Sequence, residues 1–322
     1  MMQKISVTTL FFTTLLCSSL YGYQGTHESK KKFAFDVGYC GMWRSPLKNM
    51  SFLEEGTFSE GTPIISPFEK ISFNYVSGVR ALLEINQGQK SSIEAVYTGL
   101  FNWNNDGSAT SATEIFNVCT APFRNDNWTN FYYLHYHYKS ELNSGELSYW
   151  RHVTPRYIDY FSCSWMLGLR YIDFRDSLHM NNGTGLVGDN ASVKAINQMG
   201  GIQGGLELQA NATSRMTWAI QVKGGAYADF VTRKTVFNDL GNTVQIVDSS
   251  PQRVKKDYTL ELIPYILYRL NPFYFRLAYD RVILFNPVFA PLQVQPTKFV
   301  NEVYTHNYVN FQIVYASIGF YW

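Results

Sequence analysis

The stretch Phe33–Arg44, FAFDVGYCGMWR, alternates strictly between two kinds of side chain. Its odd positions are aromatic or apolar, apart from one glycine, and its even positions are mostly small, polar or charged, with Asp36 and Arg44 among them. Successive side chains of a β-strand point to opposite faces of the sheet. A period of two with one continuous apolar face therefore predicts a strand.

The same alternation recurs along the chain. We expect about ten strands, near residues 32–44, 68–84, 91–104, 130–151, 158–175, 193–211, 214–232, 253–270, 272–286 and 308–322. Charged residues repeatedly fall on the less apolar face. Each segment reaches the roughly 9–11 residues that a tilted membrane strand needs.

The linkers between these segments alternate in length. They are short around Gln87–Gly88, after His152, at Asn211–Ala212 and at Asn271–Pro272, and long from Ser45, Asn105, Ser177, Arg233 and Pro287. Short periplasmic turns and long external loops are typical of outer-membrane barrels. We therefore predict an all-β fold, an antiparallel transmembrane β-barrel of about ten strands (range 8–12), with both ends on the periplasmic side.

The N-terminus has the layout of a secretory signal peptide. Lys4 precedes an apolar stretch, Ile5–Leu16, and small or polar residues follow as far as Gly22. We divide the chain into a signal peptide (1–22) and an outer-membrane barrel (23–322). Cys17 as a lipid-modified cysteine is the alternative, disfavoured because Leu16 is bulkier than the residue usual at that place.

Composition points to lipid contact. Aromatic and charged residues each make up 16% of the 322 residues, an unusual balance for a fully solvated surface. The net charge of +2 argues against a nucleic-acid partner. Beyond the signal peptide no stretch reaches the roughly 18 consecutive apolar residues of a membrane helix, so the chain would cross with strands. We expect the strand-end tryptophans Trp43, Trp103, Trp150 and Trp322 at the headgroups of outer-membrane lipid.

The less apolar face of the strands would line the lumen. Its charges have both signs, so we expect ion pairs across the interior. The candidate lumen-lining residues are Arg44, Arg80, Glu94, His135, His137, Arg170, Glu207, Lys223, Glu261 and Arg276. About ten strands enclose a narrow space that side chains can largely fill. Ion pairs that stiffen the barrel are therefore favoured over a selectivity-setting ring.

No motif indicates catalysis. His135 and His137 lie two apart on one strand and share a face, but no third ligand is evident, so imidazoles lining the lumen are favoured over a metal site. Ser140, Ser144 and Ser148 lie in no recognisable nucleophile motif. We therefore expect no enzyme activity, no cofactor and no metal.

The cysteines remain open. Cys40, Cys119 and Cys163 would be left after signal cleavage, an odd number that cannot form a complete disulfide framework. One pair with a free thiol, or links between molecules, are both compatible with the sequence. No C-x-x-C spacing suggests zinc.

Several short motifs carry a family resemblance. They are Ser140–Glu146, Gly168–Tyr171 with Asp173, Asn197 leading to Gly201–Gly205, Arg276–Asp280 and Ser317–Trp322. With them the chain resembles the Legionella-type major outer membrane protein family of pore-forming barrels over about Phe33–Trp322. A chlamydia-like porin relative is the alternative, although such porins are richer in cysteine. The resemblance implies a β-barrel in the cell outer membrane and pore formation, with no catalytic residues to carry over.

We therefore expect a porin-like protein of a Gram-negative bacterium that passes small hydrophilic solutes. The alternative is a surface adhesion or host-contact protein in which the barrel is a scaffold for the long loops Ser45–Ser66 and Asn104–Thr129. Besides lipid and solutes, the expected partner is the barrel-assembly machinery, through the C-terminal Phe320 and Trp322. A homo-oligomer is left open.

Overall fold

The computed structural model describes residues 32–45, 53–55, 74–87, 90–110, 116–118, 133–153, 160–183, 190–238, 246–290 and 308–322. The expected signal peptide (1–22) and Cys119 lie outside these ranges, so the division into two parts stays a prediction. Every regular element of the described residues is a β-strand. None of them forms a helix long and apolar enough to cross a membrane.

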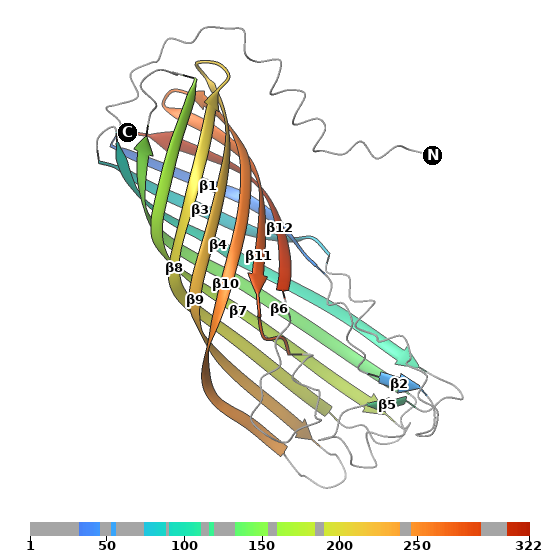
Figure 1. Cartoon of the computed structure of the whole chain (residues 1–322). Helices are drawn as coiled ribbons and strands as arrows, with labels where there is room; N and C mark the ends of the chain where they lie inside the picture. Colours follow the sequence, from blue (N-terminus) through green and yellow to red (C-terminus); the bar gives the residue numbers. More distant parts are fainter. Residues whose placement is uncertain are drawn as a thin grey trace.

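Ten strands form one closed antiparallel barrel (Figure 1). They are β1 (Phe33–Arg44), β3 (Val76–Asn86), β4 (Ser91–Thr110), β6 (Tyr133–Val153), β7 (Phe161–Gly183), β8 (Asn190–Asn211), β9 (Met216–Asn238), β10 (Ile246–Leu270), β11 (Phe273–Phe285) and β12 (Tyr308–Tyr321). Each pairs with its neighbour along the barrel, and β1 pairs with β12 to close it. The predicted fold class is confirmed. Two short strands, β2 (Leu53–Glu55) and β5 (Phe116–Val118), form a separate sheet.

The barrel closes where the chain ends. The N–H groups of Lys32 and Phe33 donate to the carbonyl of Trp322 at 3.0 and 3.1 Å. On the outer face the ring of Trp322 stacks on Phe33 and on Phe320, with centroids 5.3 and 4.7 Å apart. The Asn271–Pro272 turn lies at this same end, because the N–H of Tyr321 donates to the Pro272 carbonyl. The last strand therefore closes the barrel against the first.

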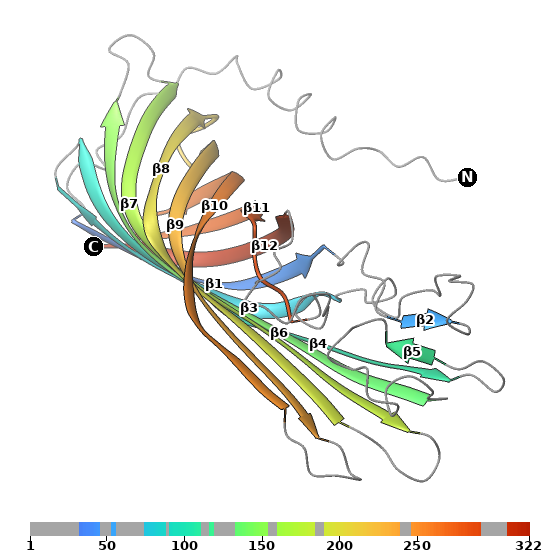
Figure 2. The same ribbon diagram turned by 60° about the horizontal axis from the view of Figure 1, so that its bottom comes forward.

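The strands differ in length, so one side of the barrel extends beyond the other. Strand β4 has 20 residues and β6 to β10 have 21 to 25. Strands β1, β3, β11 and β12 have only 11 to 14. The long strands continue past the short ones toward the loop end (Figures 1 and 2). We call this part of β4 and β6 to β10 the extension.

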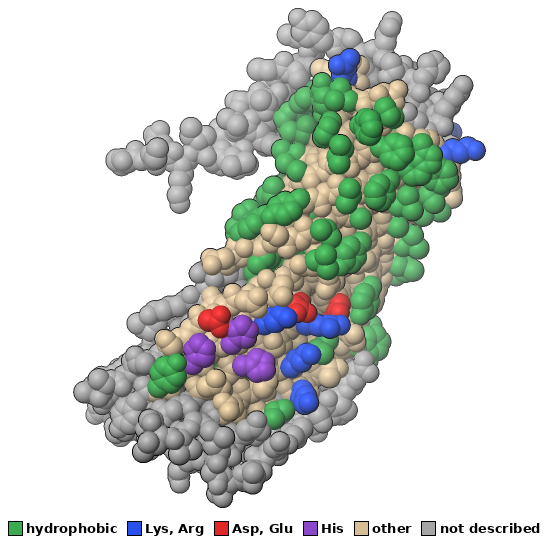
Figure 3. Space-filling model, turned by 180° about the vertical axis from the view of Figure 1, so that it is seen from behind, with side chains coloured by type: hydrophobic (Ala, Val, Ile, Leu, Met, Phe, Trp, Pro, Cys, Tyr) green, Lys and Arg blue, Asp and Glu red, His purple; other side chains and the backbone are tan. Residues whose placement is uncertain are grey.

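The two faces exchange polarity where the extension begins. On β7 the outward side chains are apolar as far as Tyr171, and beyond it the same face carries Asp173, Arg175, Ser177 and His179. Inward, the change is opposite, from Arg170 to buried side chains that include Phe174 and Leu178. Figure 3 shows the result as an apolar belt beside a patch of charged and histidine side chains. Strands β7 and β9, expected to stop near residues 175 and 232, continue to Gly183 and Asn238, and on β7 the apolar face of the continuation is turned inward.

A bulge in β4 shifts the faces by one residue. The register between β4 and β6 slips between Thr98 and Phe101, and Leu100 has φ 65°. An extra residue in one strand moves every later side chain to the other face. Phe101 and Trp103 are therefore inside the barrel and only 1% exposed, although Trp103 was expected at the lipid headgroups. Gly78 on β3 makes room, since a Cβ there would overlap the Phe101 ring.

The expected headgroup position requires all four tryptophans on the outer face of the barrel, and two of them lie there. Trp43 and Trp322 lie on the outer face and are 41% and 50% exposed. Trp103 and Trp150 do not reach the outer face. Trp103 is turned inward by the bulge, and Trp150 lies on the inward face of β6, where its indole N–H donates to Glu94 at 3.4 Å. An indole N–H can find a partner inside a polar lumen as well as at a headgroup.

Candidate functional site: the barrel lumen

The structure places eight of the ten candidate lumen residues on the inward face. They are Arg44, Arg80, Glu94, Arg170, Glu207, Lys223, Glu261 and Arg276. The lumen assignment of His135 and His137 was wrong. Both lie on the outer face of the extension, where His137 contacts the exposed Asp106 at 2.5 Å. The inward face of β6 carries Tyr136 and Tyr138 there. The extension has its apolar side inside, which reverses the assignment.

Four charged side chains form a buried network in the middle of the lumen. Arg170 of β7 contacts Glu261 of β10, and its Nε lies 3.6 Å from Glu146 of β6. Lys223 Nζ of β9 lies 3.0 Å from the same Glu146. Gln203 of β8 also donates to Glu146, at 2.9 Å. Buried charges are costly unless paired and hydrogen-bonded, and here each acid contacts a cation from a different strand. We call these four residues, Glu146, Arg170, Lys223 and Glu261, the central ionic network.

A second cluster lies nearer the chain ends. Asp36 of β1 is fully buried between Arg80 of β3 and Arg276 of β11, each 3.9 Å away. The hydroxyl of Ser317 donates to Asp36 at 2.9 Å. The guanidinium of Arg80 lies 4.7 Å from the centre of the Tyr315 ring. One carboxylate thus lies between two guanidinium groups. Each guanidinium also lies over an aromatic ring, Arg80 over Tyr315 and Arg276 over Tyr265, where the face of the ring attracts the positive charge.

Glu207 is also engaged. Its carboxylate accepts hydrogen bonds from the hydroxyl of Tyr265, at 2.9 Å, and from Gln221. Together with the contact between Glu94 and the indole of Trp150, this places seven of the eight inward candidates in polar contacts; the eighth, Arg44, is described below. The lumen at this level is built of paired groups.

A segment that follows β11 enters the lumen from the loop end. We call Asn286–Ala290 the inserted segment. Asn286 has φ 59°, and the three residues Val288, Phe289 and Ala290 are fully buried. The side chain of Asn197 on β8 holds both backbone groups of Val288, accepting from its N–H at 2.9 Å and donating to its carbonyl at 2.8 Å.

Phe289 is the apolar anchor of the inserted segment. Its ring packs edge-on against Phe174, with centroids 5.6 Å apart, and the guanidinium of Arg44 lies 4.7 Å from its centre. Arg44 is itself held by Asp176, 3.3 Å away, and Asp176 accepts from the N–H of Ala290 at 3.0 Å. Arg44, a predicted lumen residue, therefore helps to hold the inserted segment.

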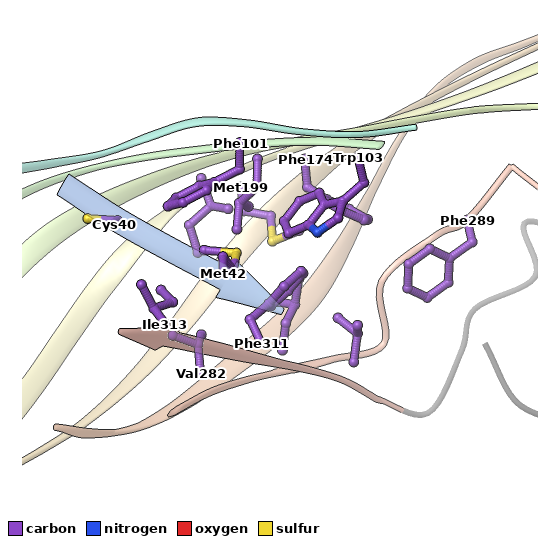
Figure 4. Packing of buried hydrophobic residues seen from close by; sticks show 14 of the residues in the cluster. Cys40, Met42, Phe101, Trp103, Phe174, Met199, Val282, Phe289, Phe311 and Ile313 are labelled. Atoms are coloured by element: carbon purple, nitrogen blue, oxygen red, sulfur yellow. The ribbon is translucent and has the colours of Figure 1, made fainter. Parts of the chain in front are cut away.

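The inserted segment completes an apolar layer above the ionic one. Figure 4 shows Phe289 beside a cluster from many strands, which includes Met42, Trp103, Phe174 and Phe311. Between this layer and the ionic network lies a cavity of ≈ 40 Å³, lined by Arg80, Glu146, Arg170, Lys223 and Asp280 together with apolar side chains. That space holds roughly one to three waters. The lumen is therefore filled by side chains at this level of the described structure.

The candidate residues expected from the sequence did not include four residues and one segment of this site. Asp36 and Asp280 fall on the inward face by simple alternation, so that signal was present. Asn197 and Asp176 become significant only through the inserted segment. The inserted segment has no period of its own, and its residues look like those of any loop.

The described residues offer no evident catalytic or metal centre. Within those ranges no three His, Cys, Asp or Glu side chains are grouped to hold a metal ion. The candidate serines are inward and engaged, Ser140 by Arg44, Ser144 by Arg170 and Ser148 by Gln203. Cys40 and Cys163 are free thiols.

No family model matches the sequence, and no curated protein does. Several solved barrels are similar in structure. The outer membrane protease OmpT from Escherichia coli has 10% identity over 93% of this chain and 99% of its own, with a TM-score of 0.43. The translocator domain of autotransporter NalP from Neisseria meningitidis has 10% identity over 97% of this chain and 96% of its own, with a TM-score of 0.36. The CymD monoaromatic hydrocarbon channel has 11% identity over 91% of this chain and 89% of its own, with a TM-score of 0.38. Likenesses at this level carry no residue roles.

Proposed function

We propose that this chain is an outer-membrane barrel that passes small hydrophilic solutes and is held closed by the inserted segment. The observation that carries the proposal is Asn286–Ala290 lying across the lumen, above a mixed-sign ionic network. The pore-forming family that the sequence resembles fits this function, and membership of that family is part of the proposal.

The outer surface supports a membrane location. Large apolar side chains such as Leu167, Leu206 and Leu277 are more than half exposed on the outer face. Exposed apolar area on this scale is costly in water, whereas a closed sheet satisfies its backbone within a bilayer. With the expected signal peptide, this supports the cell outer membrane.

The way the inserted segment is held supports gating. Its described hydrogen bonds to the wall are made by three side chains, Asn197, Asp176 and Lys255, and none of them belongs to the pairing between barrel strands. It could leave without breaking any pairing between barrel strands. Beneath it the path would be lined by Arg80, Arg170, Lys223 and Glu146, which favours hydrophilic solutes over apolar ones.

The test is planar-bilayer recording of the refolded full-length barrel. The natural chain is compared with a variant in which Val288, Phe289 and Ala290 are replaced by Gly, Ser and Gly. We expect rare conductance steps from the natural chain and frequent steps from the variant. If both fold, as judged by heat-modifiable migration on gels, and neither conducts, passage of solutes is rejected and the barrel stands.

A second candidate function is surface contact, with the barrel as scaffold. It is favoured by the extension, whose outer wall carries charged and histidine side chains beyond the apolar belt. Most of the loops Ser45–Ser66 and Asn104–Thr129 lies outside the described residues. Binding to host cells or phage that is unchanged after their deletion would remove this candidate.

Neither candidate is catalytic. His152 does lie between two hydroxyls, 3.3 Å from Ser92 and 3.0 Å from Ser164, but both serines are buried. A buried hydroxyl offers no substrate access, so we propose no enzyme activity. Recognition by the assembly machinery through the outward Phe320 and Trp322 remains part of the proposal.

A further inference from the structure

A row of lysines crosses the outer wall of the extension. The register pairs Asn104 of β4 with Lys139 of β6, Lys139 with Ser177 of β7, Ser177 with Lys194 of β8, and Lys194 with Lys234 of β9. These five residues are therefore neighbours across five strands on one face. Figure 3 shows blue side chains below the apolar belt of this wall.

Neighbouring acids balance only part of the positive charge in and around this row. Lys139 Nζ contacts Glu141 at 2.5 Å, and nearby Arg175 contacts Asp173 at 2.7 Å. Lys194 and Lys234 make no ion pair among the described residues, although they lie directly opposite each other. Like charges at such positions destabilise a sheet. A bound anion would relieve this repulsion.

A hollow lies in the middle of the row. It has a volume of ≈ 240 Å³ and is lined by Lys139, Glu141, Arg175, Asp176, Ser177 and Lys194. The carboxylate of Asp176 faces the lumen, where it contacts Arg44. The short Ser177 between two long lysines creates the recess, and its hydroxyl donates to the carbonyl of Lys139 at 3.5 Å. Arginine matches phosphate oxygens with two parallel hydrogen bonds, and lysine adds a point charge. The hollow is smaller than a typical drug-sized pocket, which suits a headgroup.

The hollow lies just outside the apolar belt. Arg175 is four residues beyond Tyr171, the last outward apolar residue of β7. At roughly 3.3 Å per residue and a strand tilt of about 45°, this places Arg175 about 9 Å above Tyr171. The long arms of Lys139 and Arg175 can reach back toward that level. Their charges would then lie where lipid headgroups carry phosphate.

We propose that the hollow formed by Lys139, Arg175, Ser177 and Lys194 binds phosphate groups of a phosphorylated glycolipid in the outer leaflet, with Lys234 beside it. The site goes beyond solute passage and rests only on the outer-membrane location within the proposed function. It would fix the height of the extension relative to the membrane. It would also join three strands, β6, β7 and β8, through one ligand.

The test measures binding of diphosphorylated lipid A to the refolded full-length barrel in detergent, by native mass spectrometry. The variant combines Lys139→Gln, Arg175→Gln and Lys194→Gln. The matched control combines Lys32→Gln, Lys90→Gln and Arg215→Gln, three exposed cations at the other end of the barrel. We expect the first variant to bind about tenfold more weakly or worse, and the control to bind like the natural chain.

Three outcomes would overturn the proposal. They are equal binding of lipid A stripped of phosphate, equal binding by the first variant, and displacement of lipid A by inorganic phosphate at a similar concentration, which would make the site one for free phosphate. Heat-modifiable migration of each variant shows that the barrel has formed. Bilayer conductance, measured on the same samples, tests solute passage separately.

Discussion

Replacing Asn197 with alanine should release the inserted segment from the lumen wall. Asn197 is fully buried, and its side chain satisfies both backbone groups of Val288 at 2.8 and 2.9 Å. Alanine keeps the strand and its ladder but removes both hydrogen bonds. The closed state would then contain a buried N–H and a buried carbonyl without these partners.

The size of the effect follows from those two groups. Leaving a buried donor or acceptor unpaired costs about 1–3 kcal/mol for each group. The closed state should therefore lose roughly 2–6 kcal/mol, with the lower end applying if water enters the space left by the amide. At about 1.4 kcal/mol for each factor of ten, 2 kcal/mol raises the ratio of open to closed barrels about 30-fold.

Single-channel recording in planar bilayers measures this ratio directly. The matched control is Asn102→Ala, an exposed asparagine on the outer face of β4. The control should keep the natural open probability, and both proteins should migrate as folded barrels before heating. An Asn197→Ala barrel that opens no more often than the control would refute the role given to the inserted segment.

Three further predictions follow from other contacts. Arg170→Met should lower the free energy of unfolding by about 3–5 kcal/mol, because Glu261 loses the cation it contacts. The control Arg215→Met, at an exposed turn, should change the free energy of unfolding little. Equal denaturant midpoints of the two variants in lipid vesicles would contradict this. In the same assay Trp103→Ala should lower the free energy of unfolding by about 3–5 kcal/mol and Trp43→Ala by much less, because the bulge places only Trp103 in the core. Similar losses of stability in the two variants would argue against the bulge. Burial, and then the charge of the nearby His137, lower the pKa of His179 below its ordinary value of 6.5. At acid pH the folded barrel therefore binds fewer protons than the unfolded chain, and its stability falls as the pH drops through 6.5. NMR titration should show this midpoint, and His137→Gln should raise it part of the way back; a midpoint at or above 6.5 in the natural protein would be inconsistent with the geometry.

Inward placement of charges followed from alternation alone on most strands. Asp36, Arg170 and Lys223 lie opposite apolar neighbours in the sequence, and they point into the lumen in the structure. The ion-pair partners of these residues could not be predicted from the alternation. Glu146 meets Lys223 from 77 residues away because the barrel curves β6 and β9 toward each other, and no local pattern encodes that distance.

The sequence by itself determined the strands, their antiparallel order and the turns at the closing end, because side-chain period and turn residues are local properties of the chain. It also marked two faces on every strand. Only the tertiary structure decided which face meets lipid, water or the core, because that depends on the neighbours. Hence the histidines moved outside, the bulge at Leu100 turned Trp103 inside, and Asn286–Ala290, which has no period of its own, closed the lumen.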